Sequence, residues 1–113
     1  VVIVELTGNK IKEMLSYLES NRTAHPLSGI QISVDENYKI IEATINEEKI
    51  DPEKTYFVAT SDYLQQGGDN MIFLKDPVNF YNTDYKIRNT IIDYFKKVDT
   101  LKTKRDNRYI KIQ

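Results

Sequence analysis

Apolar and polar residues follow two different periods along this chain, and each period predicts a different kind of element. Apolar side chains recur every three or four residues over 10–20 and over 85–98, which predicts two amphipathic helices. Apolar and polar residues alternate over 28–34 and 38–45, which predicts two strands. The turn-forming residues 35–37 lie between these strands, so we expect a hairpin there.

Three more strands are predicted from runs of apolar, aromatic and β-branched residues. Residues 1–6 are apolar on both faces, which is typical of a buried strand that is central or parallel in its sheet. Residues 55–60 and 107–112 also have the composition of strands. The fold class is therefore mixed α/β, with a single small domain in which about five strands form a mixed sheet with two main helices.

The second predicted helix combines a cap with a well-defined apolar stripe. Asp84 precedes it and is a good N-cap, because a carboxylate accepts hydrogen bonds from the first backbone N–H groups of a helix. The stripe is more typical of a core contact than of a cofactor site. It consists of Ile87, Ile91, Tyr94, Phe95 and Val98.

The remaining segments are predicted to be connections. Residues 21–27 lack periodicity and form a loop, 47–49 form a tip, and 102–105 form a short solvated basic run. The apolar piece 71–74 leads into an irregular stretch around Phe80. No repeat, low-complexity tract or internal domain boundary interrupts this order.

Composition narrows the classes of function. The chain has 113 residues, of which 40% are hydrophobic and 29% charged, as in a soluble globular domain. Its net charge of −1 gives no support for a nucleic-acid polymer as partner, and no apolar run is long enough to span a bilayer.

The chain has no cysteine and one histidine, which excludes disulfides, thiolate nucleophiles and Cys-rich or His-rich metal sites within it. His25 lies in a loop, where a lone histidine is more often solvated than catalytic. Asp62, Asp69 and Asp76 are the one carboxylate group that could be considered for a metal, and their spacing does not favour it. We therefore expect neither catalytic residues nor metal ligands in this chain.

Candidate chemistry concentrates in residues 60–69, which follow the strand 55–60. Gly67 and Gly68 allow positive φ and close approach to backbone amides, and Tyr63 and Asp69 flank the turn. An aromatic face beside a carboxylate suits a ligand with a ring and a diol, such as a nucleoside. Spacing alone is more typical of an ordinary turn after a strand.

Several separated segments, taken in order, resemble the C-terminal domain of the 5′-nucleotidase family. Any one of them is common, but the ordered set spans nearly the whole chain. The segments are Glu5-Leu6-Thr7-Gly8-Asn9-Lys10-Ile11-Lys12, Leu27-Ser28-Gly29-Ile30, Ile50-Asp51-Pro52-Glu53-Lys54-Thr55-Tyr56, Val58-Ala59-Thr60-Ser61-Asp62-Tyr63-Leu64, Gly67-Gly68-Asp69 and Asn107-Arg108-Tyr109-Ile110.

The resemblance implies the nucleoside-recognition part of a two-domain hydrolase that breaks down nucleotides. Its catalytic centre would be a pair of divalent cations of the zinc or manganese type on a metallophosphatase domain, either fused to this domain or in a separate chain. This chain alone would then be catalytically silent. Members of the family are commonly exported, so the resemblance implies a periplasmic or cell-surface location.

The resemblance also assigns roles to individual residues. Tyr63 matches the aromatic residue that stacks on the base, Asp69 matches the aspartate that holds the ribose hydroxyls, and Gly67 and Gly68 match the glycines of the turn. The family uses a second aromatic residue to complete a sandwich around the base. Ala24 falls near that position here, and alanine cannot stack, so the neighbouring His25 is the candidate substitute.

Other departures define the alternatives. The chain begins at Val1 within a strand, so residues 1–113 are expected to be a partial domain that lacks an upstream segment carrying a substrate-binding arginine and asparagine. Asn70 and Met71 stand where the family more often has glycine and an aromatic residue. The loss at Ala24 motivates a non-enzymatic interaction module on the same fold as the alternative function. A carbohydrate-binding turn would also use an aromatic residue and an aspartate.

Overall fold

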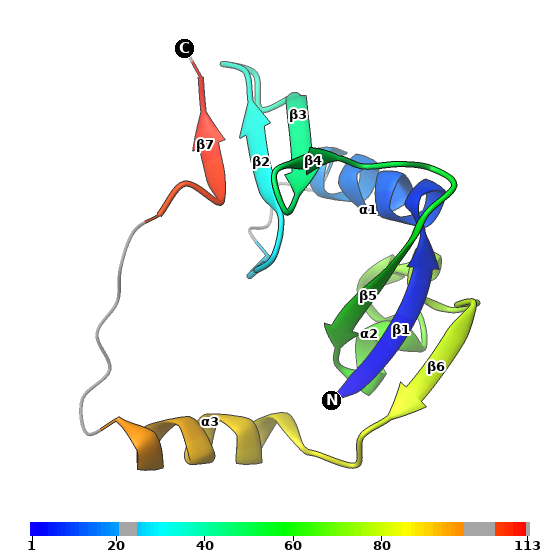
Figure 1. Ribbon diagram of the computed structural model, residues 1–113, viewed down its shortest axis with the longest axis vertical. Helices are drawn as coiled ribbons and strands as arrows, with labels where there is room; N and C mark the ends of the chain where they lie inside the picture. The colour runs from blue at the N-terminus through cyan, green and yellow to red at the C-terminus, as the bar shows by residue number, and fades with distance from the viewer. Residues whose placement is uncertain (21–24, 99–105, 113) are drawn as a thin grey trace. The chain divides into compact units, whose positions relative to one another are not determined.

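The computed structural model describes residues 1–20, 25–98 and 106–112 (Figure 1). The described residues cluster into two units. Unit 1 contains Val1–Leu6 and the chain from Tyr56 through the last helix, and unit 2 contains Thr7–Thr55 and the C-terminal strand. In chain order the elements are β1 Val2–Thr7, α1 Gly8–Ser20, β2 Gln31–Val34, β3 Ile40–Ile45, β4 Glu48–Lys49, β5 Thr55–Thr60, α2 Asp62–Gln65, the 3₁₀ helices η1 Gly68–Asn70 and η2 Ile72–Leu74, β6 Asn79–Asn82, α3 Ile87–Lys97 and β7 Tyr109–Lys111.

Unit 2 is a four-stranded sheet covered by a helix. Its strand order is β4-β3-β2-β7, with β2 and β3 antiparallel and β2 and β7 parallel. The predicted hairpin of residues 28–45 is thereby confirmed. Buried Ile30, Ile32 and Val34 form the core of this unit. The predicted stripe of α1 packs on that core through Met14, Leu15 and Leu18.

A close contact fixes the start of α1. The N–H of Gly8 donates to the carbonyl oxygen of Lys54 at 2.8 Å. A Cβ atom on Gly8 would lie 1.9 Å from the carbonyl oxygen of Asp51, so only glycine fits against this turn. The helix consequently begins at Gly8, slightly before the predicted start, and ends at Ser20 as predicted.

The predicted tip at 47–49 contains a short strand. β4 pairs with β3 through Thr44 opposite Lys49 and Ile45 opposite Glu48. Asn46 and Glu47 both have positive φ, 53° and 65°, as required in a two-residue hairpin loop whose twist matches its strands. The tip is therefore a second hairpin, which sequence alternation was too short to indicate.

Unit 1 contains a three-stranded sheet in the order β5-β1-β6 (Figure 1). β1 is central, as predicted, and its side chains Val2, Val4 and Leu6 are buried. β6 was predicted to be irregular but pairs antiparallel with β1. The fold class is confirmed as mixed α/β, although the strands form two sheets rather than one.

The start of the last helix corrects one prediction. α3 begins at Ile87 with Lys86 in the N-cap position and no side-chain cap. Asp84 is not the cap, because it has a positive φ of 56° and its own N–H donates to Asn82 Oδ1 at 2.9 Å. Asp84 therefore belongs to the turn between β6 and α3, where aspartate tolerates a left-handed conformation.

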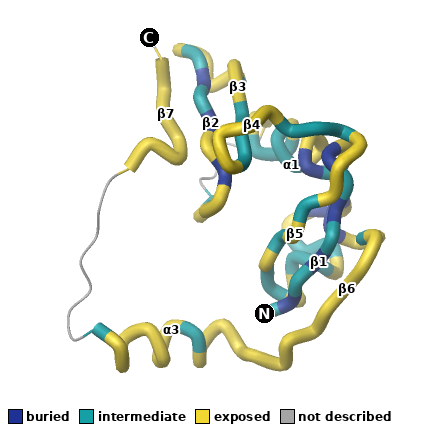
Figure 2. Tube along the Cα trace, in the orientation of Figure 1, coloured by how far each residue is buried: buried dark blue, intermediate teal, exposed yellow. Residues whose placement is uncertain are grey.

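The apolar stripe of α3 corrects a second prediction. None of the residues of α3 is buried, and Ile91 and Phe95 are 53% and 46% exposed. Figure 2 shows most of this helix in the colour of exposed residues. The predicted core role of the stripe is therefore wrong for the described structure.

Two further predictions concern charge and membranes. The basic run 102–105 lies outside the described residues. Among the residues that are described, no helix is both long enough and apolar enough to cross a membrane.

Candidate functional site

The candidate turn begins with a one-turn helix, α2, where the sequence predicted only a short polar turn. Ser61 caps α2 from an extended backbone, and its hydroxyl accepts a hydrogen bond from the N–H of Leu64 at 3.1 Å. Gln65 ties the other side of α2 to the chain beyond η2, because its Nε2 donates to the carbonyl oxygens of Leu74 and Lys75 at 3.3 and 3.4 Å. Both ends of the helix are thus fixed.

The two glycines have different physical roles. Gly67 has φ of 97°, a left-handed conformation that ends α2. A Cβ atom on Gly68 would lie 2.4 Å from Cε2 of Tyr63, so the tyrosine ring lies directly against the glycine backbone. Gly67 therefore sets the direction of the chain, whereas Gly68 provides the space for Tyr63.

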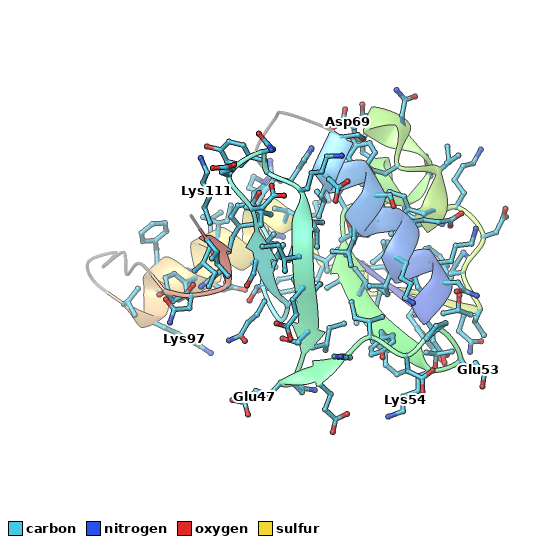
Figure 3. All side chains as sticks on the ribbon, turned by 90° about the horizontal axis from the view of Figure 1, so that it is seen from above. Glu47, Glu53, Lys54, Asp69, Lys97 and Lys111 are labelled. Carbon is cyan, nitrogen blue, oxygen red and sulfur yellow. The ribbon has the colours of Figure 1, made fainter. Side chains whose placement is uncertain are left out.

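The structure brings Tyr63 and Asp69 together. The Tyr63 hydroxyl donates to Asp69 Oδ1 at 3.1 Å. Asp69 is held in a left-handed conformation with φ of 55°, which turns its carboxylate back toward α2. Tyr63 is 60% exposed, and Asp69, labelled in Figure 3, is also exposed. An aromatic ring and a carboxylate are thus presented side by side at the surface of unit 1.

His25 belongs to unit 2, whereas the other four predicted site residues belong to unit 1. It is half-buried, and its ring lies 5.8 Å from that of Tyr17 at an interplanar angle of 51°. Its Nε2 is buried without a hydrogen-bond partner among the described residues. Ala24 lies outside the described residues. The role of His25 as a second stacking residue stays a prediction.

The carboxylates considered for a metal have other contacts or positions. Asp62 accepts a hydrogen bond from the N–H of Tyr63 at 2.8 Å, and Asp69 accepts one from the Tyr63 hydroxyl. Within the described parts of the chain, no three His, Cys, Asp or Glu side chains are grouped so that they could hold an ion. The described residues therefore do not fit a dimetal centre.

A groove of about 530 Å³ lies in unit 1, beside the same turn, and sequence reasoning missed it. Its lining residues come from α2, from the connection between η2 and β6, and from β6 itself: Gln65, Lys75, Asp76, Pro77, Val78, Asn79 and Phe80. The sequence did not indicate the groove because the segment around Phe80 was predicted to be irregular, whereas the groove depends on the pairing of β6 with β1. Val78 and Phe80, two residues apart in an apolar-polar alternation, were the one pattern that pointed to it.

Comparison with known proteins gives this geometry a context. The family described as 5′-nucleotidase, C-terminal domain, matches residues 1–76, which include the whole candidate turn. No curated protein matches the chain.

Solved structures give the same fold. The chain is similar to a 5′-nucleotidase precursor from Thermus thermophilus, with a TM-score of 0.82 and 20% identity, over 98% of this chain and 25% of that one. It is also similar to a candidate 5′-nucleotidase from Staphylococcus aureus, solved in complex with alpha-ketoglutarate, with a TM-score of 0.65 and 13% identity, over 97% of this chain and 27% of that one.

At these identities the structural likeness shows the fold, and the chain spans about a quarter of the length of either protein. The family match covers well over half of the chain. The chain therefore belongs to the 5′-nucleotidase C-terminal domain family.

Proposed function

We propose that this chain is the nucleoside-recognition part of a 5′-nucleotidase-like phosphoesterase. The observation that carries the proposal is the contact of Tyr63 with Gly68 and Asp69. It places an exposed aromatic ring beside a carboxylate on one turn. The ring would stack on the base, and the carboxylate of Asp69 would accept hydrogen bonds from the ribose hydroxyls.

The surrounding contacts support binding because they fix the turn before a ligand arrives. Ser61 and Gln65 anchor the two ends of α2, and Gly67 sets the chain direction. A site that is ordered in advance loses less conformational entropy on binding.

The hydrolytic step would belong to another domain. We place a pair of divalent cations of the zinc or manganese type on a metallophosphatase domain, fused to this chain or separate from it. Such a pair, when bound, activates water and neutralises charge on the phosphoryl group. The proposed role of this chain is to hold the nucleoside. Family resemblance alone supports a periplasmic or cell-surface location.

An NMR titration of the ¹⁵N-labelled chain with adenosine, uridine and glucose tests this function. We expect saturable shifts of the amides of Tyr63 and Gly67–Asp69 with nucleosides and not with glucose. Base stacking on an aromatic side chain is worth about 1–3 kcal/mol, so Tyr63→Ala should weaken nucleoside binding about fivefold or more. Tyr94→Ala, which removes another exposed tyrosine, from α3, is the matched control.

Two results would reject the proposal. Glucose could produce the same shifts as the nucleosides, which would indicate a carbohydrate site. Alternatively, Tyr63→Ala and Tyr94→Ala could bind a nucleoside equally well, which would remove the stacking role and favour a non-enzymatic interaction module. The exposed apolar stripe of α3 is the observation that favours such a module.

A further inference from the structure

β6 is an edge strand. It pairs with β1 on one side, and within the described residues no strand lies on its other side. All four of its residues, Asn79–Asn82, are exposed (Figure 2). An edge strand offers a row of unpaired N–H and C=O groups to which an extended chain can add.

The register shows which backbone groups point outward. The N–H of Thr83 donates to the carbonyl oxygen of Val1 at 3.3 Å, and Ile3 lies opposite Tyr81. Because the backbone groups of an antiparallel strand alternate in direction, those of Tyr81 point toward β1. The N–H and C=O groups of Phe80 and Asn82 therefore point away from β1, toward the free edge.

The groove lies beside this same edge. Phe80 is opposite Val4, whose side chain is fully buried, and opposed residues in an antiparallel pair share a face of the sheet. The Phe80 ring is thus on the core side of the sheet, where it lines the 530 Å³ groove with Val78 and Pro77. A strand added beside β6 would extend over this groove.

The charge of the groove adds a further constraint on its occupant. Lys75 lines the groove, and a Cβ atom built on Gly67 would lie 3.0 Å from its Cδ. The lysine stem is therefore close to the turn backbone. Within the described residues Lys75 forms no ion pair, so its ammonium group can pair with an acidic side chain. Asp76 also lines the groove, and its carboxylate would repel a second acidic group on the same occupant.

We propose that the free edge of β6 binds an extended peptide as an added strand. The peptide backbone pairs with the outward groups of Phe80 and Asn82. One apolar side chain of the peptide enters the groove beside Val78 and Phe80, and an acidic side chain two residues away, on the same face, lies toward Lys75. A compact ligand would fill the groove but would leave the outward backbone groups of β6 unpaired. An extended peptide directs its own backbone groups outward at every second residue, as β6 does, so it can pair with them.

Amide hydrogen exchange on the chain tests the proposal, with the capped pentapeptide acetyl-Thr-Val-Thr-Glu-Thr-amide as probe. At saturation we expect exchange at Phe80 and Asn82 to slow by about tenfold or more, because exchange then requires the new hydrogen bonds to open. Tyr81, already directed toward β1, should change much less. A second form of the peptide carries N-methyl groups on alternate residues, which removes their N–H groups. Where these residues are the ones whose backbone faces β6, the peptide should no longer protect the amides of Phe80 and Asn82.

A matched pair of variants at one position adds a second readout. Asn82→Pro removes the outward N–H and should abolish peptide binding. The fold should tolerate this proline, because edge strands accept proline where no hydrogen bond to the neighbouring strand is lost. Asn82→Ala keeps the N–H and should bind the peptide as the unchanged chain does. Both variants lose the side-chain contact to Asp84, so the comparison isolates the backbone group.

Three outcomes would overturn the proposal. The peptide could fail to bind at millimolar concentration, or it could shift groove residues without protecting Phe80 and Asn82, which would make the groove a small-ligand site. Protection that rises with protein concentration in the absence of peptide would assign the edge to a second copy of the chain. Peptide affinity should be unchanged by saturating adenosine, so this result is independent of the proposed nucleoside site.

Discussion

At the scale of single residues, the candidate site depends on which atoms a glycine leaves room for. Gly8 and Gly68 are each in a contact that a methyl group would violate, but their neighbours differ. Gly8 faces the backbone of Asp51, whereas Gly68 faces the ring of the exposed Tyr63. A backbone carbonyl in a hydrogen-bonded turn cannot move as a side chain can, so the two glycines should respond differently to substitution.

We expect Gly68→Ala to reduce nucleoside binding while leaving the fold stable. The new methyl group would displace the Tyr63 ring, which can rotate into solvent, so the free energy of unfolding should change by less than about 1 kcal/mol. Gly8→Ala should instead destabilise the chain by about 2 kcal/mol or more, because it overpacks against backbone. Urea unfolding measures the stability of both variants. A Gly68→Ala variant that binds adenosine normally would contradict the placement of Tyr63.

A tyrosine at position 63 adds a hydroxyl that a phenylalanine would lack, and this hydroxyl donates to Asp69. In Tyr63→Phe the ring stays available for stacking, and Asp69 Oδ1 no longer accepts from the phenol. We therefore expect adenosine affinity to stay within about threefold of the original, in contrast to Tyr63→Ala. NMR titration of the two variants side by side measures the difference. Equal losses in both would mean that the hydroxyl, and not the ring, binds the ligand.

At the scale of elements, the local sequence pattern predicted the helices and strands whose contacts are with residues nearby in the sequence. The hairpin β2–β3 and helix α1 follow from alternation and helical spacing, since their partners are near in sequence. β6 could not be predicted in this way, because its pairing with β1 joins residues more than 70 positions apart in the chain, such as Glu5 and Asn79. The sequence predicted that Tyr63 and Asp69 flank the turn, but it did not predict the contact of the Tyr63 ring with Gly68, because ring orientation depends on the left-handed turn between these two residues.

The start of α3 provides a prediction about pH. The Tyr85 hydroxyl donates to the carboxylate of Asp93, and this hydrogen bond raises the pKa of Tyr85 above its ordinary value. A raised pKa means that the bond is fully present below the ordinary tyrosine pKa and is lost as pH rises through the higher folded value. An NMR titration of ¹³C-labelled tyrosines should therefore show that Tyr85 ionises at a higher pH than a tyrosine in the unfolded chain.

Asp93→Asn is the control for this titration, because it removes the charge and keeps the size of the side chain. The pKa of Tyr85 should then fall toward the ordinary value, and α3 should keep its amide shifts. If Tyr85 ionises at the same pH in both proteins, the contact with Asp93 does not hold the turn before α3 in solution.

At the scale of the whole molecule, family membership and the site have different supports. The fold and the family rest on a match over residues 1–76 and on the likeness to two larger proteins, of which this chain covers about a quarter. Nucleoside recognition rests on Tyr63 and Asp69, and hydrolysis is proposed for a domain outside the chain. The sequence could predict the family because its segments keep their order, whereas their spatial grouping into two sheets required long-range pairing.

The division of labour between domains makes a direct prediction about catalysis. The chain alone, supplied with Mn²⁺ or Zn²⁺, should hydrolyse adenosine monophosphate no faster than metal in buffer, because the described residues offer no group of three metal-ligating side chains. Phosphate release measures this, and an identically purified Asp69→Asn variant serves as the control for contaminating phosphatase. Activity that persists through further purification and falls in Asp69→Asn would place catalysis within this chain.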